Sequence, residues 1–163
     1  QNNPDKKTQK IFRDWNSPEA IMSSIKYCEN LREECLEKMQ SLIFETVLSR
    51  YDKVDYIKRA IENGFFVRLF FVCTTSPNIN ASRITDRVMK GGHDVPIPKI
   101  ISRYYESIKN SCELTKIVDR AYLYDNSIDN KDAELLFRLS EGKLAKQYTE
   151  SIPEWAGIIL NTI

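Results

Sequence analysis

The stretch that decides the fold covers residues 65–96 and reads FFVRLFFVCTTSPNINASRITDRVMKGGHDVP. Its first nine residues, 65–73, are apolar except for Arg68 and are rich in aromatic and β-branched side chains. A strand that is buried on both faces shows such a continuous apolar run, whereas a half-solvated strand alternates. Residues 65–73 are therefore predicted to form a strand covered on both faces.

A helix is predicted directly after this strand. Ser76 suits the N-cap because its hydroxyl can accept a hydrogen bond from a backbone N–H of the first turn, and Pro77 suits the first helical position. Gly91 and Gly92 supply the stop, since glycine readily adopts the backbone conformation that ends a helix. The stretch thus predicts a strand, a helix and a break before the next helix.

Three arginines surround this break. Arg83 and Arg87 are four residues apart and so share one helix face, and Arg103 follows in the next helix. Planar guanidinium groups bind phosphate oxygens in bidentate fashion, and arginines on a mobile segment can stabilise a phosphoryl group during transfer. Solvated arginines on a helix surface have the same spacing, so the spacing alone leaves both interpretations open.

Helices and short strands alternate along the rest of the chain. The first is a helix over 17–40, whose inward residues are Ile21, Ile25, Cys28, Cys35 and Met39. A strand over 42–47 and a helix ending at Gly64 are expected next. After the stretch 65–96 we expect a helix over 100–108, a strand over 121–124, an antiparallel hairpin over 135–148 and a helix from Pro153. This alternation predicts an α/β domain with a mainly parallel sheet. The length predicts a single domain over residues 1–163.

Charge and hydropathy exclude several classes of protein. The 24 basic and 23 acidic residues give a net charge of +1, so nothing draws the whole surface to nucleic acid or membrane. No apolar run approaches the roughly 18 residues of a membrane span, and the polar start QNNPDKKTQK is unlike a signal peptide. We therefore predict a cytoplasmic protein with no nucleic-acid or membrane partner.

The cysteines do not predict a metal site. Cys28, Cys35, Cys73 and Cys112 form no CxxC pair, and His93 is the only histidine available to join them. Structural zinc sites need tighter ligand spacing than this. Reduced and partly buried thiols are the better interpretation.

Polar residues follow two of the predicted strands. Glu45, Thr46, Ser49 and Arg50 cluster at the end of the first, and Asp125, Asn126 and Ser127 come directly after the strand over 121–124. Ligands of α/β sheets collect at the carboxyl ends of the strands. Both groups are therefore expected to lie along one edge of the sheet.

Four segments together resemble the zeta toxin family and its relatives known as predicted ABC-type ATPases. They are FETVLSR (44–50), LFFVCTTSPNINASRITDRVMKGGHDVP (69–96), KIISRYYESI (99–108) and YLYDNS (122–127), in the same order and spacing. The resemblance implies a P-loop kinase-like three-layer sandwich with a helical lid. It also implies that ATP and Mg²⁺ serve to phosphorylate a small substrate, which is a nucleotide sugar such as UDP-N-acetylglucosamine in the best-known toxins.

The resemblance also implies roles for individual residues. Glu45 matches the family's acid that holds a magnesium-bound water or a substrate hydroxyl, although a glutamate that caps a helix or pairs with a base fits the same position. Arg83 and Arg87 match the lid arginines, and Arg87 is the better candidate for the transferring phosphate. Arg103 matches the arginine after the lid, with an ion pair across the lid as its alternative.

The remaining candidates lie in loops. Thr46, Ser49 and Arg50 are placed on the substrate side. His93 could act as a general base, but a histidine bonded to the backbone, with Asp94 capping the following helix, explains these two residues without chemistry. The last group resembles the loop that borders the adenine, and consists of Asp125, Asn126 and Ser127. Asx residues also favour turns for local reasons.

The chain departs from the family in one respect, because it contains no GxxxxGK[ST] segment. In the family that segment, like the aspartate that acts as base, lies upstream of the matched residues. The sequence starts at Gln1 without a methionine. We therefore expect either an additional upstream segment or a fragment whose strand edges another chain fills, and residues 1–163 alone are not expected to catalyse phosphoryl transfer.

Three functions fit these observations. The first is a small-molecule kinase of the zeta toxin type. The second is a regulatory domain that binds or hydrolyses a nucleotide without kinase activity. The third is a non-catalytic interaction fragment held by an antitoxin-like protein or by a second copy of the chain.

Overall fold

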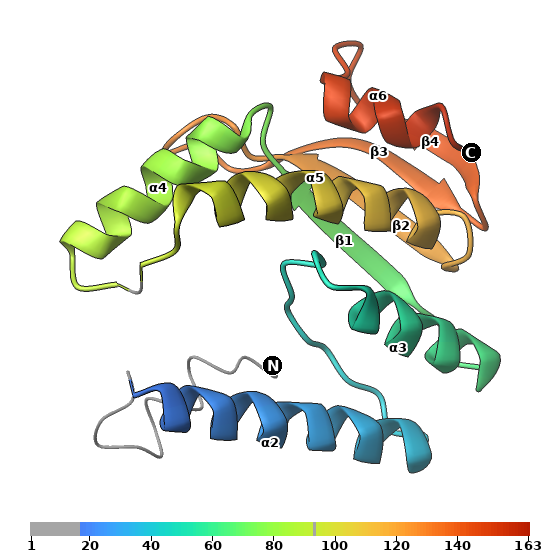
Figure 1. Ribbon diagram of the computed structural model, residues 1–163. Helices are drawn as coiled ribbons and strands as arrows, with labels where there is room; N and C mark the ends of the chain where they lie inside the picture. Colours follow the sequence, from blue (N-terminus) through green and yellow to red (C-terminus); the bar gives the residue numbers. More distant parts are fainter. Residues whose placement is uncertain (1–16, 93) are drawn as a thin grey trace. The chain divides into compact units, whose positions relative to one another are not determined.

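The computed structural model describes residues 17–92 and 94–163 (Figure 1). They belong to two compact units, residues 1–46 and 47–163, and each is described by itself. The described residues contain five helices and a four-stranded mixed sheet. The α/β class is therefore confirmed, whereas a single domain over 1–163 and the three-layer arrangement with its lid stay predictions.

The first unit contains helix α2, Pro18–Glu37. Its start is confirmed, because Ser17 is the N-cap and its Oγ accepts a hydrogen bond from Ala20 N at 3.2 Å. The buried residues recur every four positions and are Ala20, Ser24, Cys28, Arg32 and Leu36. Of the stripe expected to face inward, only Cys28 belongs to this set, so the buried face is rotated from the predicted one.

Arg32 explains part of that rotation. Its guanidinium lies over the Phe44 ring, 5.4 Å from the centroid, and one of its nitrogens is 3.9 Å from a carboxylate oxygen of Glu29. A long basic side chain can bury its stem when its charged group has such partners. A reading based on apolar residues alone passes over an arginine in this position.

The predicted strand over 42–47 was wrong. This segment is irregular apart from a single bridge at Phe44, and no continuous ladder forms there among the described residues. A strand needs a neighbour for its backbone groups as well as apolar side chains. The preceding helix also ends earlier than expected, at Glu37, and Met39 has a left-handed backbone with φ of 53°.

The second unit is built on one sheet with the strand order β1-β2-β3-β4. The strands are β1 Arg68–Cys73, β2 Arg120–Asp125, β3 Glu134–Ser140 and β4 Lys143–Gln147. Only β1 and β2 are parallel, whereas β2–β3 and β3–β4 are antiparallel. The expectation of a mainly parallel sheet was therefore wrong, because the strand over 42–47 does not form and the C-terminal hairpin extends the same sheet.

Strand β1 is covered on one face only. Phe71 and Cys73 are buried, whereas Phe70 is 60 % and Val72 53 % exposed. The prediction of a strand covered on both faces was therefore wrong. The four apolar side chains alternate between two different environments, and β1 lies at the edge of the sheet.

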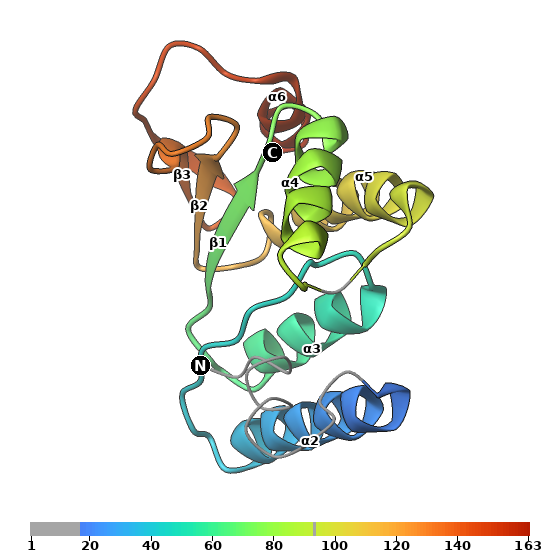
Figure 2. The same cartoon turned by 90° about the vertical axis from the view of Figure 1, so that its left-hand side faces the viewer.

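The helices of the second unit are α3 Tyr51–Glu62, α4 Pro77–Met89, α5 Ile97–Leu114 and α6 Glu154–Leu160. Figure 2 shows α4 and α5 on one side of strands β1 and β2. Helix α6 contacts the buried face of β1, where the rings of Trp155 and Phe71 meet edge to face with centroids 5.7 Å apart. Tyr104 and Ile108 are buried on α5.

The C-terminal hairpin is confirmed. Glu141 and Gly142 both have positive φ, 50° and 71°, as the two central residues of a tight hairpin turn require. A Cβ at Gly142 would lie 2.7 Å from the backbone oxygen of Lys116, so glycine is also needed for space. The final helix is confirmed as well, with Trp155 and Ile159 buried, although Ile158 is 46 % exposed.

Candidate functional site

The parallel pair of strands brings two loops to one edge of the sheet. Cys73 of β1 and Asp125 of β2 are register partners, and each is the last residue of its strand. The chain continues from them into residues 74–77, which lead into α4, and residues 126–129. The start of the predicted lid helix and the predicted adenine loop therefore lie side by side.

Hydrogen bonds fix the loop after β2 to Cys73 and Thr75, at the end of β1 and just beyond it. Asn126 N donates to Cys73 O at 2.8 Å, and Thr75 N donates to Ser127 Oγ at the same distance. Asp125 Oδ1 accepts from Ser127 N at 2.8 Å, and its Oδ2 accepts from Trp155 Nε1 at 3.3 Å. Both carboxylate oxygens of Asp125 thus serve to hold the loop and helix α6 in place.

The start of α4 is held equally firmly. The N-cap is Ser76, as predicted, and its Oγ accepts from Asn78 N at 3.2 Å. Thr74 Oγ1 donates to Ser76 O at 3.0 Å, and the buried Tyr104 hydroxyl donates to Thr74 O at 2.8 Å. Burial raises the pKa of the Tyr104 hydroxyl, so it stays a hydrogen-bond donor at neutral pH.

Arg83 joins α4 to the loop. Its Nε donates to Asp129 Oδ1 at 2.8 Å, its Nη2 lies 2.7 Å from the same oxygen, and its Nη1 donates to Asn126 O at 2.7 Å. These are short contacts of a charged donor, which are stronger than neutral hydrogen bonds. Arg83 is therefore engaged with the loop that follows β2.

Arg87 lies one helical turn further along α4 and is exposed. The helix ends two residues later, where Gly92 N donates to Arg87 O at 2.8 Å and Gly91 has a φ of 85°. The predicted glycine stop is thereby confirmed. Arg103 is half-buried on α5.

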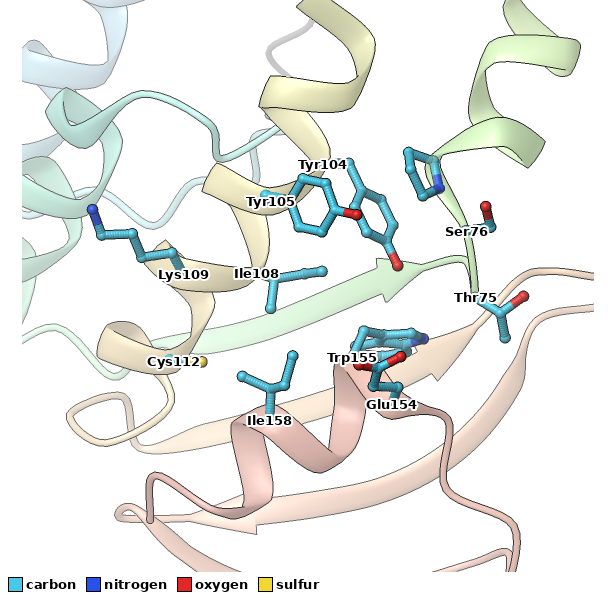
Figure 3. Close-up of a pocket in the computed structure, with 11 residues that line it drawn as sticks. Thr75, Ser76, Tyr104, Tyr105, Ile108, Lys109, Cys112, Glu154, Trp155 and Ile158 are labelled. Atoms are coloured by element: carbon cyan, nitrogen blue, oxygen red, sulfur yellow. The ribbon is translucent and has the colours of Figure 1, made fainter.

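A pocket of about 490 Å³ opens beside this edge, between α5, α6 and the start of α4 (Figure 3). It is lined by Thr75, Ser76, Pro77, Tyr104, Tyr105, Ile108, Lys109, Cys112, Glu154, Trp155 and Ile158. Sequence reasoning did not identify it. The available signals were the tyrosine pair of the segment 99–108 and the tryptophan of the last helix.

The polar residues before α3 are divided between the two units. Glu45 and Thr46 are exposed in the first unit, so their placement beside the arginines stays a prediction. Ser49 is half-buried in the second unit, and Arg50 Nε lies 3.3 Å from Asp52 Oδ1. Whether Ser49 and Arg50 contact a substrate also stays a prediction.

A buried left-handed turn precedes those last two residues. Leu48 has a φ of 60° and is 4 % exposed, and its carbonyl accepts a hydrogen bond from the buried Asn110 Nδ2 at 2.8 Å. A branched side chain rarely adopts this conformation, and it persists only where its surroundings impose it. Asn110 of α5 thus fixes the backbone from which Ser49 and Arg50 extend.

Two candidates of the break after α4 had different outcomes. His93 lies outside the described residues. Asp94 is exposed, and α5 has Pro96 at its N-cap without a side-chain hydrogen bond, so the suggestion that Asp94 caps this helix was wrong. Proline at the N-cap and again at Pro98 starts the helix through its restricted φ.

Within residues 17–92 and 94–163, no group of three or more His, Cys, Asp or Glu side chains could hold a metal ion. The water-mediated role of Glu45 toward Mg²⁺ stays a prediction. None of the described helices is long and apolar enough to cross a membrane.

The zeta toxin family matches residues 20–137, which is well over half of the chain. The chain therefore belongs to the zeta toxin family, as the sequence resemblance predicted. No curated protein matched the chain, nor did any solved structure. The matched range includes α4, α5 and the loop after β2, and the family implies a P-loop kinase-like protein that uses a nucleotide.

Proposed function

We propose that this protein transfers the γ-phosphoryl group of ATP to a hydroxyl of a small acceptor, with a nucleotide sugar as the acceptor class. One observation carries the proposal beyond family membership. Helix α4, which holds both lid arginines, starts at the carboxyl edge of β1 and is joined by Arg83 to the loop after β2. A nucleotide at this edge would thus lie beside both elements.

The proposed roles follow from the chemistry of each side chain. Arg87 stabilises the negative charge on the phosphoryl group in transit, and Arg103 supports it. Glu45 orients a magnesium-bound water or the acceptor hydroxyl, since magnesium prefers oxygen ligands and keeps several waters. Thr46, Ser49 and Arg50 contact the acceptor. These roles apply to a polypeptide that carries the family's phosphate-binding loop, acts in the cytoplasm and is controlled by an antitoxin-like protein.

The test is an acceptor screen with the natural gene product that contains these residues. The protein is incubated with ATP, Mg²⁺ and a panel of nucleotide sugars. The products are then separated, and their masses are measured by mass spectrometry. We expect one acceptor to gain a single phosphoryl group while ADP accumulates in equal amount. If ATP is consumed at the same rate without any acceptor, the protein is a nucleotide hydrolase, and if ATP is not consumed at all, the proposal is wrong.

The alternative of an interaction protein is favoured by the exposed face of β1. Phe66, Phe70 and Val72 are each more than half exposed, and Phe70 stacks on Tyr122 at 4.9 Å between ring centroids. Apolar groups of this size on an edge strand are typical of surfaces that pair with another segment. If the protein forms a stable complex with an antitoxin-like protein or a second copy and shows no ATP turnover, the interaction function is favoured over the kinase.

A further inference from the structure

We infer that Arg83 is a positioning residue for the nucleobase, because it clamps α4 to residues 126–129 and so sets where the Asn126 side chain meets the base. The inference rests on the proposed function, in which a nucleotide binds at this edge. It gives Arg83 a different role from the phosphate contact that its place in the lid suggests. Within the loop already expected to border the adenine, it assigns the choice of base to one side chain, that of Asn126.

The contacts of Arg83 argue against a phosphate partner. All three of its guanidinium nitrogens lie 2.7–2.8 Å from Asp129 Oδ1 or Asn126 O. A phosphate would have to displace the carboxylate of Asp129 or share the guanidinium with it, and two like charges that close repel each other. The Arg83 side chain is only 27 % exposed, so one edge of its guanidinium group is occupied by contacts within the protein.

The same contacts leave one group of the loop free to read a ligand. The backbone of Asn126 is used on both sides, since its N–H donates to Cys73 O and its carbonyl accepts from Arg83 Nη1. Within the described part of the chain its side-chain amide makes no hydrogen bond, and the residue is half-exposed. An amide offers a donor and an acceptor next to each other, which matches the paired donor and acceptor on the edge of adenine.

The position of this amide depends on the clamp. Asn126 follows the fixed end of β2, and three residues later Asp129 is drawn back to α4 by the ion pair. Without Arg83, the Asn126 carbonyl loses its partner and the loop from 126 to 130 is held only at its start. The base would then meet a loop of several conformations, and selection between purines would weaken.

The experiment compares Arg83→Ala and Asp129→Asn with Asp132→Asn, which changes an exposed acid of the same loop that lies outside the clamp. We expect the first two variants to raise KM for ATP by about 10- to 100-fold with kcat within about threefold, as loss of charged hydrogen bonds predicts. They should also lose preference for ATP over GTP. Asp132→Asn should behave as the wild type.

Two further variants separate the clamp from simple loss of structure. The reversed pair Arg83→Asp with Asp129→Arg should recover part of the ATP preference that either single reversal removes. Asn126→Ala should lower the ATP preference without faster hydrogen exchange of the loop amides. Arg83→Ala should speed that exchange at residues 126–130. Unchanged exchange together with a fall in kcat at constant KM would overturn the inference.

ADP affinity, measured by calorimetry, keeps this test separate from the proposed function. If the wild type transfers no phosphoryl group, the proposed function fails, and the affinities for ADP and GDP decide about the clamp. An Arg83→Ala variant that binds ADP as the wild type does, with equal exchange of the loop, would contradict the clamp whatever the turnover. Weaker ADP binding with faster exchange would support it.

Discussion

The two halves of α4 differ sharply, although the sequence gives each of them an arginine on the same face. The first half is tied to its surroundings by the cap at Ser76, the Thr74 hydroxyl and the contacts of Arg83. The second half carries the exposed Arg87 and ends at a glycine stop. Two arginines one turn apart on the same helix thus have different surroundings, because Arg83 is bound to the loop after β2 and Arg87 is exposed.

The largest expected effect comes from the exposed half. Arg87→Ala should lower kcat by about 1000-fold or more with a small change in KM for ATP, because an arginine that stabilises the transferring phosphoryl group acts only in the transition state. Lys90→Ala, which removes another exposed positive charge just after the helix, is the matched control. Steady-state kinetics on both variants decide, and a near-normal kcat for Arg87→Ala would make it an ordinary surface residue.

The second effect tests whether the carboxylate of the first unit belongs to the same chemistry. Glu45→Gln should lower kcat by about 100- to 1000-fold while the melting temperature stays unchanged, since the amide keeps the shape but cannot bind magnesium-bound water as a charged group. Glu37→Gln at the end of α2 serves as the control. An equally large loss of melting temperature in Glu45→Gln would assign it to structure.

The third effect concerns the thiol of Cys73, the last residue of β1, which lies close before the first half of α4. Burial raises the pKa of the Cys73 thiol to about 11 from its ordinary value of 9.0. The thiolate is the reactive form, so at pH 8 its fraction should be about 100-fold smaller than for an ordinary thiol. Alkylation followed by peptide mass spectrometry should show Cys73 reacting at least that much more slowly than free glutathione. Equal rates would mean that the chain around Cys73 opens freely to solvent.

The smallest effect separates two neighbouring tyrosines. Tyr104→Phe removes the hydroxyl that donates to Thr74 O and should lower the free energy of unfolding by about 1–2 kcal/mol. Tyr105 is 60 % exposed, so Tyr105→Phe should leave that free energy almost unchanged. Urea denaturation of both variants provides the comparison. Equal effects would show that the contact to Thr74 does not hold the start of α4.

Local signals in the sequence predicted what local geometry decides. The Ser76 cap, the glycine stop of α4 and the hairpin over 135–148 depend on residues that are close in the sequence, and each was confirmed. The family resemblance added the expectation that Arg83 and Arg87 belong to a lid, and this expectation stays a prediction.

The errors arose where a distant partner decides the outcome. The segment 42–47 has the apolar residues of a strand but no ladder, and β1 has an apolar run but only one covered face. The clamp was equally hidden, since Asp129 lies 46 residues beyond Arg83 and is one of several acids near the end of β2. No spacing rule connects the two.

The most direct test measures kcat and KM for ATP of Arg83→Ala and Arg87→Ala beside the wild-type gene product, with one acceptor and one preparation. We predict that Arg87→Ala loses kcat at nearly constant KM, and that Arg83→Ala raises KM at nearly constant kcat. The same loss of kcat in both variants would contradict it, because the two arginines would then act on the phosphoryl group together.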